Sequence, residues 1–422
     1  MIIYNINKFF ILKFIIFLLL LFSSCSNNNE IVKNIIDQKI EYNEVIKRGN
    51  YIQLEQINNF WQSQNIDSYI YDYQYNLINK VNFGKGLKNY QTLISNLLIY
   101  DNYIFLIDNK GKLSKYNIQN KEFEWQKEIE TENSVDEIWP ISIINSDEYL
   151  IVTSGDGTVK AFDHSGNFKW KSNFNMTIRT PSYLINNLIL IFLNNGDLIS
   201  LDLESGEQIW KFNKLKNKIS SISGGQLFKY ENLLLAISPK GEIHIIDYFF
   251  GEYPELDNNF NLLFKPLNIN NFDYLISLNI FDNKLIIIEN NESYTTYDLL
   301  NNEIIIDHKN IQQNQYSKII NNSIITLSND NFLKSYNISN GNIFWQTDMN
   351  DLIKSKDSII KIIETNDFFV VFTSNGLIFH IERNTGSIIN KFKLKLNNIS
   401  SIYLHKNYIF FITEDATMYI YE

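Results

Sequence analysis

The sequence predicts an all-β fold: an eight-bladed β-propeller of four-stranded antiparallel blades, with the ring closed by an N-terminal strand. A short pattern recurs eight times, with successive turn positions 39 to 51 residues apart. A repeat of about 40–45 residues is the size of one propeller blade. Each turn follows a run of β-branched and aromatic residues, which is typical of a buried strand. The turn positions are Gly111, Gly157, Gly196, Gly241, Glu292, Asn331, Gly376 and Ala416.

The clearest copy of the pattern runs from Gly196 to Trp210. Its turn residue is Gly, and other copies have Asn, because these residues tolerate the positive φ of tight hairpins. The apolar run 188–192 before the turn indicates a buried strand. After the turn, residues 198–203 alternate between two kinds of side chain, which indicates a strand with two different faces.

An acidic residue or Asn closes the strand six positions after most turns. A short polar side chain there can hydrogen-bond the main chain of its own turn, so we interpret these residues as structural, with a metal site as the alternative. The five histidines stand singly, without metal-ligand spacing, so we expect no metal. The strand-closing residues are Asn117, Asp163, Asp202, Asp247, Asp298, Asn337 and Glu382.

Tryptophan follows the turn by about fourteen residues in four copies. At the end of the third strand it would lie across the neighbouring blade and seal the gap, with roughly 150–250 Å² of surface to bury. The sealing residues are Trp125, Trp170, Trp210 and Trp345. Three copies have Glu255, Ile306 or Asn390 at this place, and we expect weaker seals there.

The chain reaches Glu422 directly after the third strand of the eighth copy. An open last blade would expose a sheet edge, which propellers avoid. The segment from Ser68 to Phe83, before the first blade, is the expected donor of the fourth strand.

Charge and motifs argue against several functions. The net charge is −10 and no basic patch is present, so nucleic acid is not an expected partner. The sequence has no Gly-x-Ser-x-Gly, no phosphate-binding glycine loop and no His-Glu-x-x-His. We therefore expect no catalytic residues and no cofactor.

The single cysteine, Cys25, follows two serines and an apolar run of nine residues, Phe14–Phe22. The run is too short to span a bilayer but fits a signal-peptide core, and the small residues before Cys25 resemble a bacterial lipobox. We expect a signal peptide at 1–24, a lipidated Cys25 with a flexible Asn-rich tether at 25–60, and a propeller at 61–422. An ordinary secretory signal is the alternative.

Together, the repeat and the lipobox resemble the BamB family, the PQQ-like propeller lipoproteins of the outer-membrane β-barrel assembly machinery, from about Trp61 to Glu422. The resemblance implies a non-enzymatic scaffold on the periplasmic face of the outer membrane. Ser26 is not the Asp that retains lipoproteins at the inner membrane in enteric bacteria, and resemblance to that sorting rule also suggests the outer membrane. The family resemblance implies binding to the periplasmic domains of a BamA-like barrel subunit. In the family, two apolar residues and an Arg make this contact, and Met176, Ile178 and Arg179 match them.

One family feature is missing, because two acidic residues of the next loop are replaced by Ser221 and Ser223. The family also implies a role with unfolded outer-membrane proteins, which could bind by β-augmentation. Two other functions stay open. One is a generic ligand- or polysaccharide-binding lipoprotein, and the other is a quinoprotein dehydrogenase, which would usually be longer and carry calcium ligands.

Overall fold

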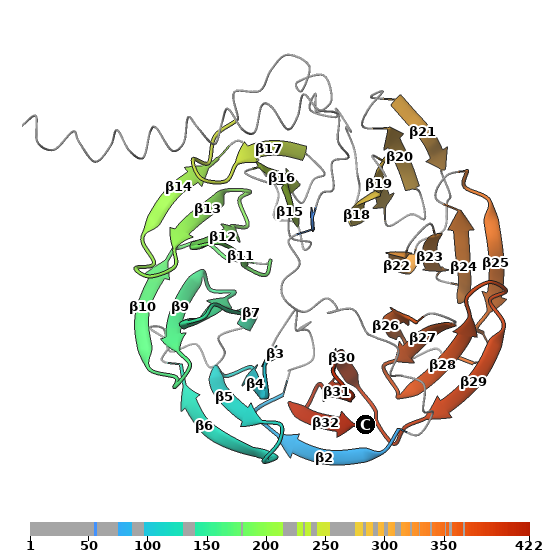
Figure 1. Cartoon of the computed structure of the whole chain (residues 1–422), viewed down its shortest axis with the longest axis horizontal. Coiled ribbons are helices and arrows are strands. Elements are labelled where there is room, and N and C mark those ends of the chain that lie inside the picture. Colours follow the sequence, from blue (N-terminus) through green and yellow to red (C-terminus); the bar gives the residue numbers. More distant parts are fainter. Residues whose placement is uncertain are drawn as a thin grey trace, which may run out of the picture. The chain divides into compact units, whose positions relative to one another are not determined.

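Strands and turns make up the described part of the chain, which belongs to one compact unit, Gln53–Glu422. The computed structural model describes residues 55–56, 75–86, 97–129, 140–178, 180–213, 226–230, 233–237, 243–253, 275–281, 284–289, 294–298, 303–308, 314–320, 323–328, 330–337, 340–350, 352–353, 357–365 and 368–422. The strands in these ranges form eight four-stranded sheets (Figure 1). Within the same ranges, no helix has the length and apolarity needed to cross a membrane.

The first four sheets are antiparallel, and each joins strands that are consecutive in the chain. The one exception is β1 (Glu55–Gln56) in sheet 4, which comes from far earlier in the chain. Sheet 1 contains β3 (Leu97–Tyr100), β4 (Tyr103–Ile107), β5 (Lys112–Asn117) and β6 (Glu122–Glu128). Sheet 2 contains β7 (Pro140–Asn145), β8 (Tyr149–Ser154), β9 (Thr158–Asp163) and β10 (Phe168–Asn173). Sheet 3 contains β11 (Tyr183–Ile185), β12 (Leu188–Phe192), β13 (Leu198–Asp202) and β14 (Gln208–Phe212). Sheet 4 contains β1 (Glu55–Gln56), β15 (Gln226–Tyr230), β16 (Leu233–Ile237) and β17 (Ile243–Asp247).

The next four sheets follow the same order, and the last borrows a strand from the N-terminal side of the chain. Sheet 5 contains β18 (Leu275–Phe281), β19 (Lys284–Glu289), β20 (Tyr294–Asp298) and β21 (Glu303–His308). Sheet 6 contains β22 (Asn314–Ile320), β23 (Ser323–Ser328), β24 (Phe332–Asn337) and β25 (Ile343–Asp348). Sheet 7 contains β26 (Ile359–Glu364), β27 (Phe368–Thr373), β28 (Leu377–Glu382) and β29 (Ile388–Lys393). Sheet 8 contains β30 (Ile399–His405), β31 (Tyr408–Thr413), β32 (Thr417–Tyr421) and β2 (Leu77–Asn82).

The predicted turn residues have the backbone conformation that the turns require. The described ones all have positive φ, from 59° at Ala416 and 61° at Asn331 to 94° at Gly157. An L residue pays a steric cost in this region that glycine avoids. The glycines and Asn of the pattern therefore shape the hairpins between the second and third strands.

Burial differs from strand to strand within a sheet. The apolar second strands are buried along nearly their whole length, as in β12 and β27. The third strands are buried on both faces as well, including polar residues such as Ser200 and His380. The two sets of side chains that alternate along a third strand therefore both lie in packed faces, because each face of the sheet meets a neighbouring sheet. Fourth strands alternate in exposure, as β29 does.

Neighbouring sheets share hydrophobic clusters. Five of the six clusters join consecutive sheets: 1 with 2, 2 with 3, 3 with 4, 6 with 7, and 7 with 8. The sixth joins sheet 8 to sheet 1, where Met418 and Ile420 pack with Leu106 and Tyr116. The last sheet therefore packs against the first.

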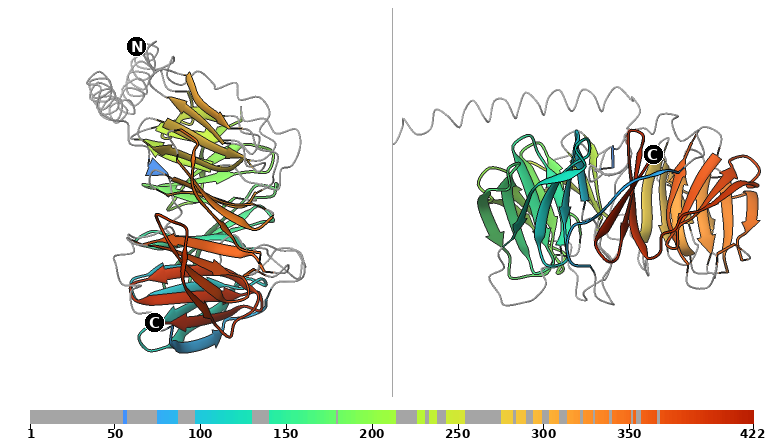
Figure 2. Two further views of the ribbon diagram at one scale, coloured as in Figure 1. Left: turned by 90° about the vertical axis from the view of Figure 1, so that its right-hand side faces the viewer. Right: turned by 90° about the horizontal axis from the view of Figure 1, so that it is seen from below.

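β2 completes sheet 8, and it lies inside the segment predicted to donate a strand. It pairs with β32 from Leu77 opposite Tyr421 to Asn82 opposite Thr417, and Figure 2 shows this blue strand beside the red strands of sheet 8. The main chains of Asn76 and Glu422 exchange two hydrogen bonds of 3.0 and 3.1 Å. The amide of Asn79 also donates to the Tyr116 hydroxyl of sheet 1.

Sheet 4 gains a strand from the expected tether. Glu55 and Gln56 form β1, which pairs with Lys229 and Phe228 of β15. Part of the 25–60 segment is therefore paired with the repeats. The lipidation position Cys25 lies outside the described residues.

Deleting residues 68–83 should abolish folding or lower the melting temperature by roughly 10 °C or more, because β32 would lose its partner strand and sheet 8 its packing on sheet 1. Differential scanning calorimetry would measure the change. Lys80→Ser is the control, since it leaves the β2 main chain intact and removes only an exposed side chain and its contact with the Tyr419 ring. A deletion variant that melts like the wild type would contradict the role of β2.

Candidate interaction site and inter-sheet contacts

The loop before sheet 3 carries the residues predicted to contact a partner. Met176 is half-buried and packs against the cluster shared by sheets 2 and 3. Ile178 is only 1% exposed and forms an isolated β-bridge with Leu193. The Thr177 carbonyl accepts a hydrogen bond of 2.9 Å from the Asn194 main chain.

This burial corrects the interpretation of Ile178 as an exposed contact. Its side chain fills the core between the two sheets, because the bridge to Leu193 turns it inward. Ile178 therefore anchors the loop, and Met176 is the partly accessible apolar residue. Arg179 lies outside the described residues, as do Ser221 and Ser223.

The predicted sealing tryptophans lie on the fourth strands, and not on the third strands as the sequence suggested. The fourth strand follows the second turn of each repeat and faces the next sheet, so an indole there can reach across. Each indole N–H donates to a main-chain carbonyl of the next sheet at 2.8 to 3.2 Å. The pairs are Trp125 with His164, Trp170 with Leu203, Trp210 with Tyr248, and Trp345 with Arg383.

A glycine in the next sheet's turn makes room for each indole. Gly206 has φ +71°, and a Cβ built on it would overlap the Trp170 ring. A side chain there would meet both a strained backbone and a buried ring. Trp170, Trp210 and Trp345 are 7 to 8% exposed, whereas Trp125 is only half-buried. The seals therefore differ in depth.

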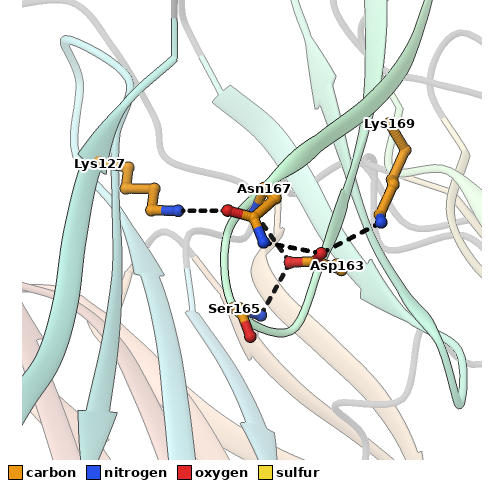
Figure 3. A network of polar contacts seen from close by, with 5 residues as sticks. All are labelled: Lys127, Asp163, Ser165, Asn167 and Lys169. Carbon is orange, nitrogen blue, oxygen red and sulfur yellow. Dashed lines mark hydrogen bonds and ion pairs between the residues drawn. The ribbon is translucent and has the colours of Figure 1, made fainter.

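A polar network reinforces the contact between sheets 1 and 2 (Figure 3). Lys127 of β6 donates to the Asn167 amide oxygen at 3.0 Å, and Asn167 donates to Asp163. Asp163 also accepts from the Ser165 main chain and pairs with Lys169 at 3.2 Å. Burial alone would raise the pKa of Asp163, but the hydrogen bonds from Asn167 and the Lys169 ammonium outweigh it and hold the pKa at about 2.

The strand-closing polar residues bond their own turns, as predicted. Asp202 accepts from the Glu204 and Ser205 main chains at 3.1 and 2.8 Å. Asn117 accepts from Gln119 and Asn120 in the same way. Across the described ranges, no three His, Cys, Asp or Glu side chains gather as a metal site would require. These oxygens therefore serve the turns.

Sheet 7 has Asn390 at the sealing position, and a different contact closes its junction with sheet 8. The Tyr75 hydroxyl, just before β2, lies 2.9 Å from Nε2 of His380. His380 is stacked on Phe368 with ring centroids 4.7 Å apart, and Tyr75 meets Phe392 edge-on. Burial lowers the pKa of His380 from its ordinary 6.5 to about 4. Sequence reasoning missed this pair, although the absent Trp was a signal that another seal was needed.

A family model described as outer membrane protein assembly factor BamB matches residues 90–290. The matched region spans the tryptophan seals of sheets 1 to 3 and the Met176 loop. Over these residues the chain is similar to the BamB-like PQQ-repeat family. Comparison with curated proteins gives no match.

Solved structures show the same β-propeller fold at low identity. BamB from Moraxella catarrhalis has a TM-score of 0.62 and 14% identity, covering 83% of this chain and 100% of that one. The Saccharomyces cerevisiae protein Sqt1 has a TM-score of 0.58 and 13% identity over 82% of this chain and 98% of its own. The computationally designed protein Ika8 has a TM-score of 0.56 and 13% identity over 81% and 99%. These likenesses establish the fold.

Trp210→Ala should lower the free energy of unfolding by about 3–5 kcal/mol, because it removes a buried indole and leaves a cavity between sheets 3 and 4. Trp125→Ala should cost less, since that ring is already half-exposed. Urea denaturation followed by circular dichroism would compare the two. Equal and small losses would contradict the sealing role.

Stability should fall as the pH drops from about 6.5 to about 4, partly because of His380. In this window the unfolded chain binds a proton on this histidine and the folded chain does not, so protonation favours unfolding. His380→Gln removes the titrating imidazole. As the pH falls, the melting temperature of the wild type should therefore drop more than that of the variant. A difference that is constant with pH would rule out this contribution.

Proposed function

We propose that this chain is a non-enzymatic scaffold lipoprotein of outer-membrane β-barrel assembly. The observation that carries the proposal is the BamB-family match over residues 90–290, which includes the loop expected to contact a partner. In this proposal the eight sheets are the blades of one propeller, closed by β2. Cys25 carries the lipid, and the domain lies at the periplasmic face of the outer membrane.

The partner surface is the loop that Ile178 anchors. Ile178 fixes the main chain against Leu193, and in the sequence Met176 precedes it and Arg179 follows it. An arginine beside a partly accessible apolar side chain is a common interface anchor. The proposed partner is the periplasmic part of a BamA-like barrel subunit. With Ser221 and Ser223 in place of acidic residues, the contact rests on Met176 and Arg179. Unfolded outer-membrane proteins are a further proposed client, bound along strand edges.

Arg179→Glu combined with Met176→Ser should strongly reduce co-purification with the barrel subunit after cross-linking in native membranes, because the anchor loses its charge and its apolar contact. Arg383→Glu is the matched control: it reverses the same charge in the turn of sheet 7, away from the loop. Full recovery of the barrel subunit with the double variant would refute this site. Recovery of unrelated proteins alone from the wild type would refute the assembly role and favour a generic binding lipoprotein.

A further inference from the structure

The turn that follows β17 differs in chemistry from the equivalent turns. Two positions that are polar in sheets 1, 3 and 7 are Phe249 and Phe250 here, and their side chains are 40% and 48% exposed. Tyr253, at the end of the same turn, is 46% exposed. The equivalent pairs in sheets 1, 3 and 7 are Gln119-Asn120, Glu204-Ser205 and Asn384-Thr385.

The turn does not need these aromatic side chains for its shape. The Asp247 carboxylate accepts hydrogen bonds from the Phe249 and Phe250 main chains at 2.9 and 3.3 Å. Asp202 holds the turn of sheet 3 with the same two bonds and polar residues. The seal is also ordinary, since the Trp210 indole donates to the Tyr248 carbonyl. The exposed rings are therefore additional to the fold.

The three exposed aromatic side chains belong to the same turn, which the bridge between Asp247 and Glu252 closes. We call Phe249, Phe250 and Tyr253 the aromatic turn patch. Tyr253 stacks on His244 with its hydroxyl 2.7 Å from Nδ1, so one end of the patch is polar and the rest is apolar. Apolar groups gathered on a surface commonly mark an interaction site.

The chain from the expected lipid anchor enters sheet 4 at the same end as this patch. Glu55 is opposite Lys229, Lys229 is opposite Leu234, and Leu234 is opposite Ile246. Ile246 is one residue before Asp247, where the aromatic turn begins. Because β1 is antiparallel to β15, β1 starts at this end and runs away from it. β1 therefore begins at the same end of the sheet as the turn, with β15 and β16 between them.

We propose that the aromatic turn patch contacts the surface of a phospholipid bilayer. The inference rests on the proposed lipid anchor at Cys25, which is 30 positions before Glu55. The tether expected from the sequence, if it behaves as a random coil, would have an end-to-end distance of about 30 Å, which would keep the patch close to the membrane and favour even a weak contact. Tyr and Phe suit the boundary between headgroups and acyl chains. With a net charge of −10, the chain has no overall attraction to anionic lipid, so the contact is apolar.

A photo-cross-linker tests this contact in the full chain. Benzoylphenylalanine replaces Phe250 in one variant and Phe344 in the control. Phe344 is a phenylalanine of similar exposure, 51%, at the start of β25 in sheet 6. Both proteins are irradiated in native membranes and in vesicles of phosphatidylethanolamine and phosphatidylglycerol. The proteins are then digested, and mass spectrometry identifies the cross-linked adducts on their peptides. Unchanged melting temperatures confirm that both variants fold.

The expected result is a phospholipid adduct at position 250 and none above background at position 344. A protein adduct at 250, or equal lipid adducts at both positions, would overturn the bilayer as the partner, and so would no adduct. The mass of the N-terminal peptide reports acylation of Cys25 separately. An unacylated chain that still forms the lipid adduct would refute the anchor and keep the patch, whereas an acylated chain without the adduct would refute the patch alone.

Discussion

The fold depends on one constraint: the sheets whose side chains the structure describes are too apolar to leave either face in water. Third strands bury even Ser200 and His380, so a sheet in this chain is stable only between two others. The indole contacts meet this requirement locally, since each places a large ring over the turn of the next sheet and fixes it with one hydrogen bond. The constraint also explains why sheet 8 must find both a missing strand and a neighbour.

The chain meets the constraint in different ways at different junctions. Where a tryptophan is present, a glycine in the next turn accommodates it, as Gly206 does for Trp170. Where Asn390 replaces it, Tyr75 and His380 form the contact from a remote segment. In the first solution the sealing contact itself is an uncharged indole hydrogen bond, while in the second it includes the titratable His380. The junctions are therefore equivalent in position but not in their response to acid.

Features that repeat could be predicted from the sequence, and features that occur once could not. The turn glycines, the polar strand ends and the donor segment around β2 follow from spacing, because their physical cause is local or is a simple count of strands. The tryptophans were identified correctly but placed on the wrong strand, since spacing alone does not show which strand faces the next sheet. Ile178 was expected to contact a partner. Its burial was missed because it depends on a bridge to Leu193, which the sequence pattern does not show. The Tyr75–His380 pair joins residues 305 positions apart, and no local sequence pattern predicts it.

β2 also has a consequence for how the protein is made. Asn82 and Thr417, which face each other across the last sheet, are 335 residues apart in the chain. β2 is synthesised before any complete sheet, yet its partner β32 is the last of the described strands. Long-range pairing of this kind is slow, and a chain truncated before β32 would carry an unmatched β2. The pairing thereby acts as a check on synthesis, because sheet 8 can be completed only after β32 has been made.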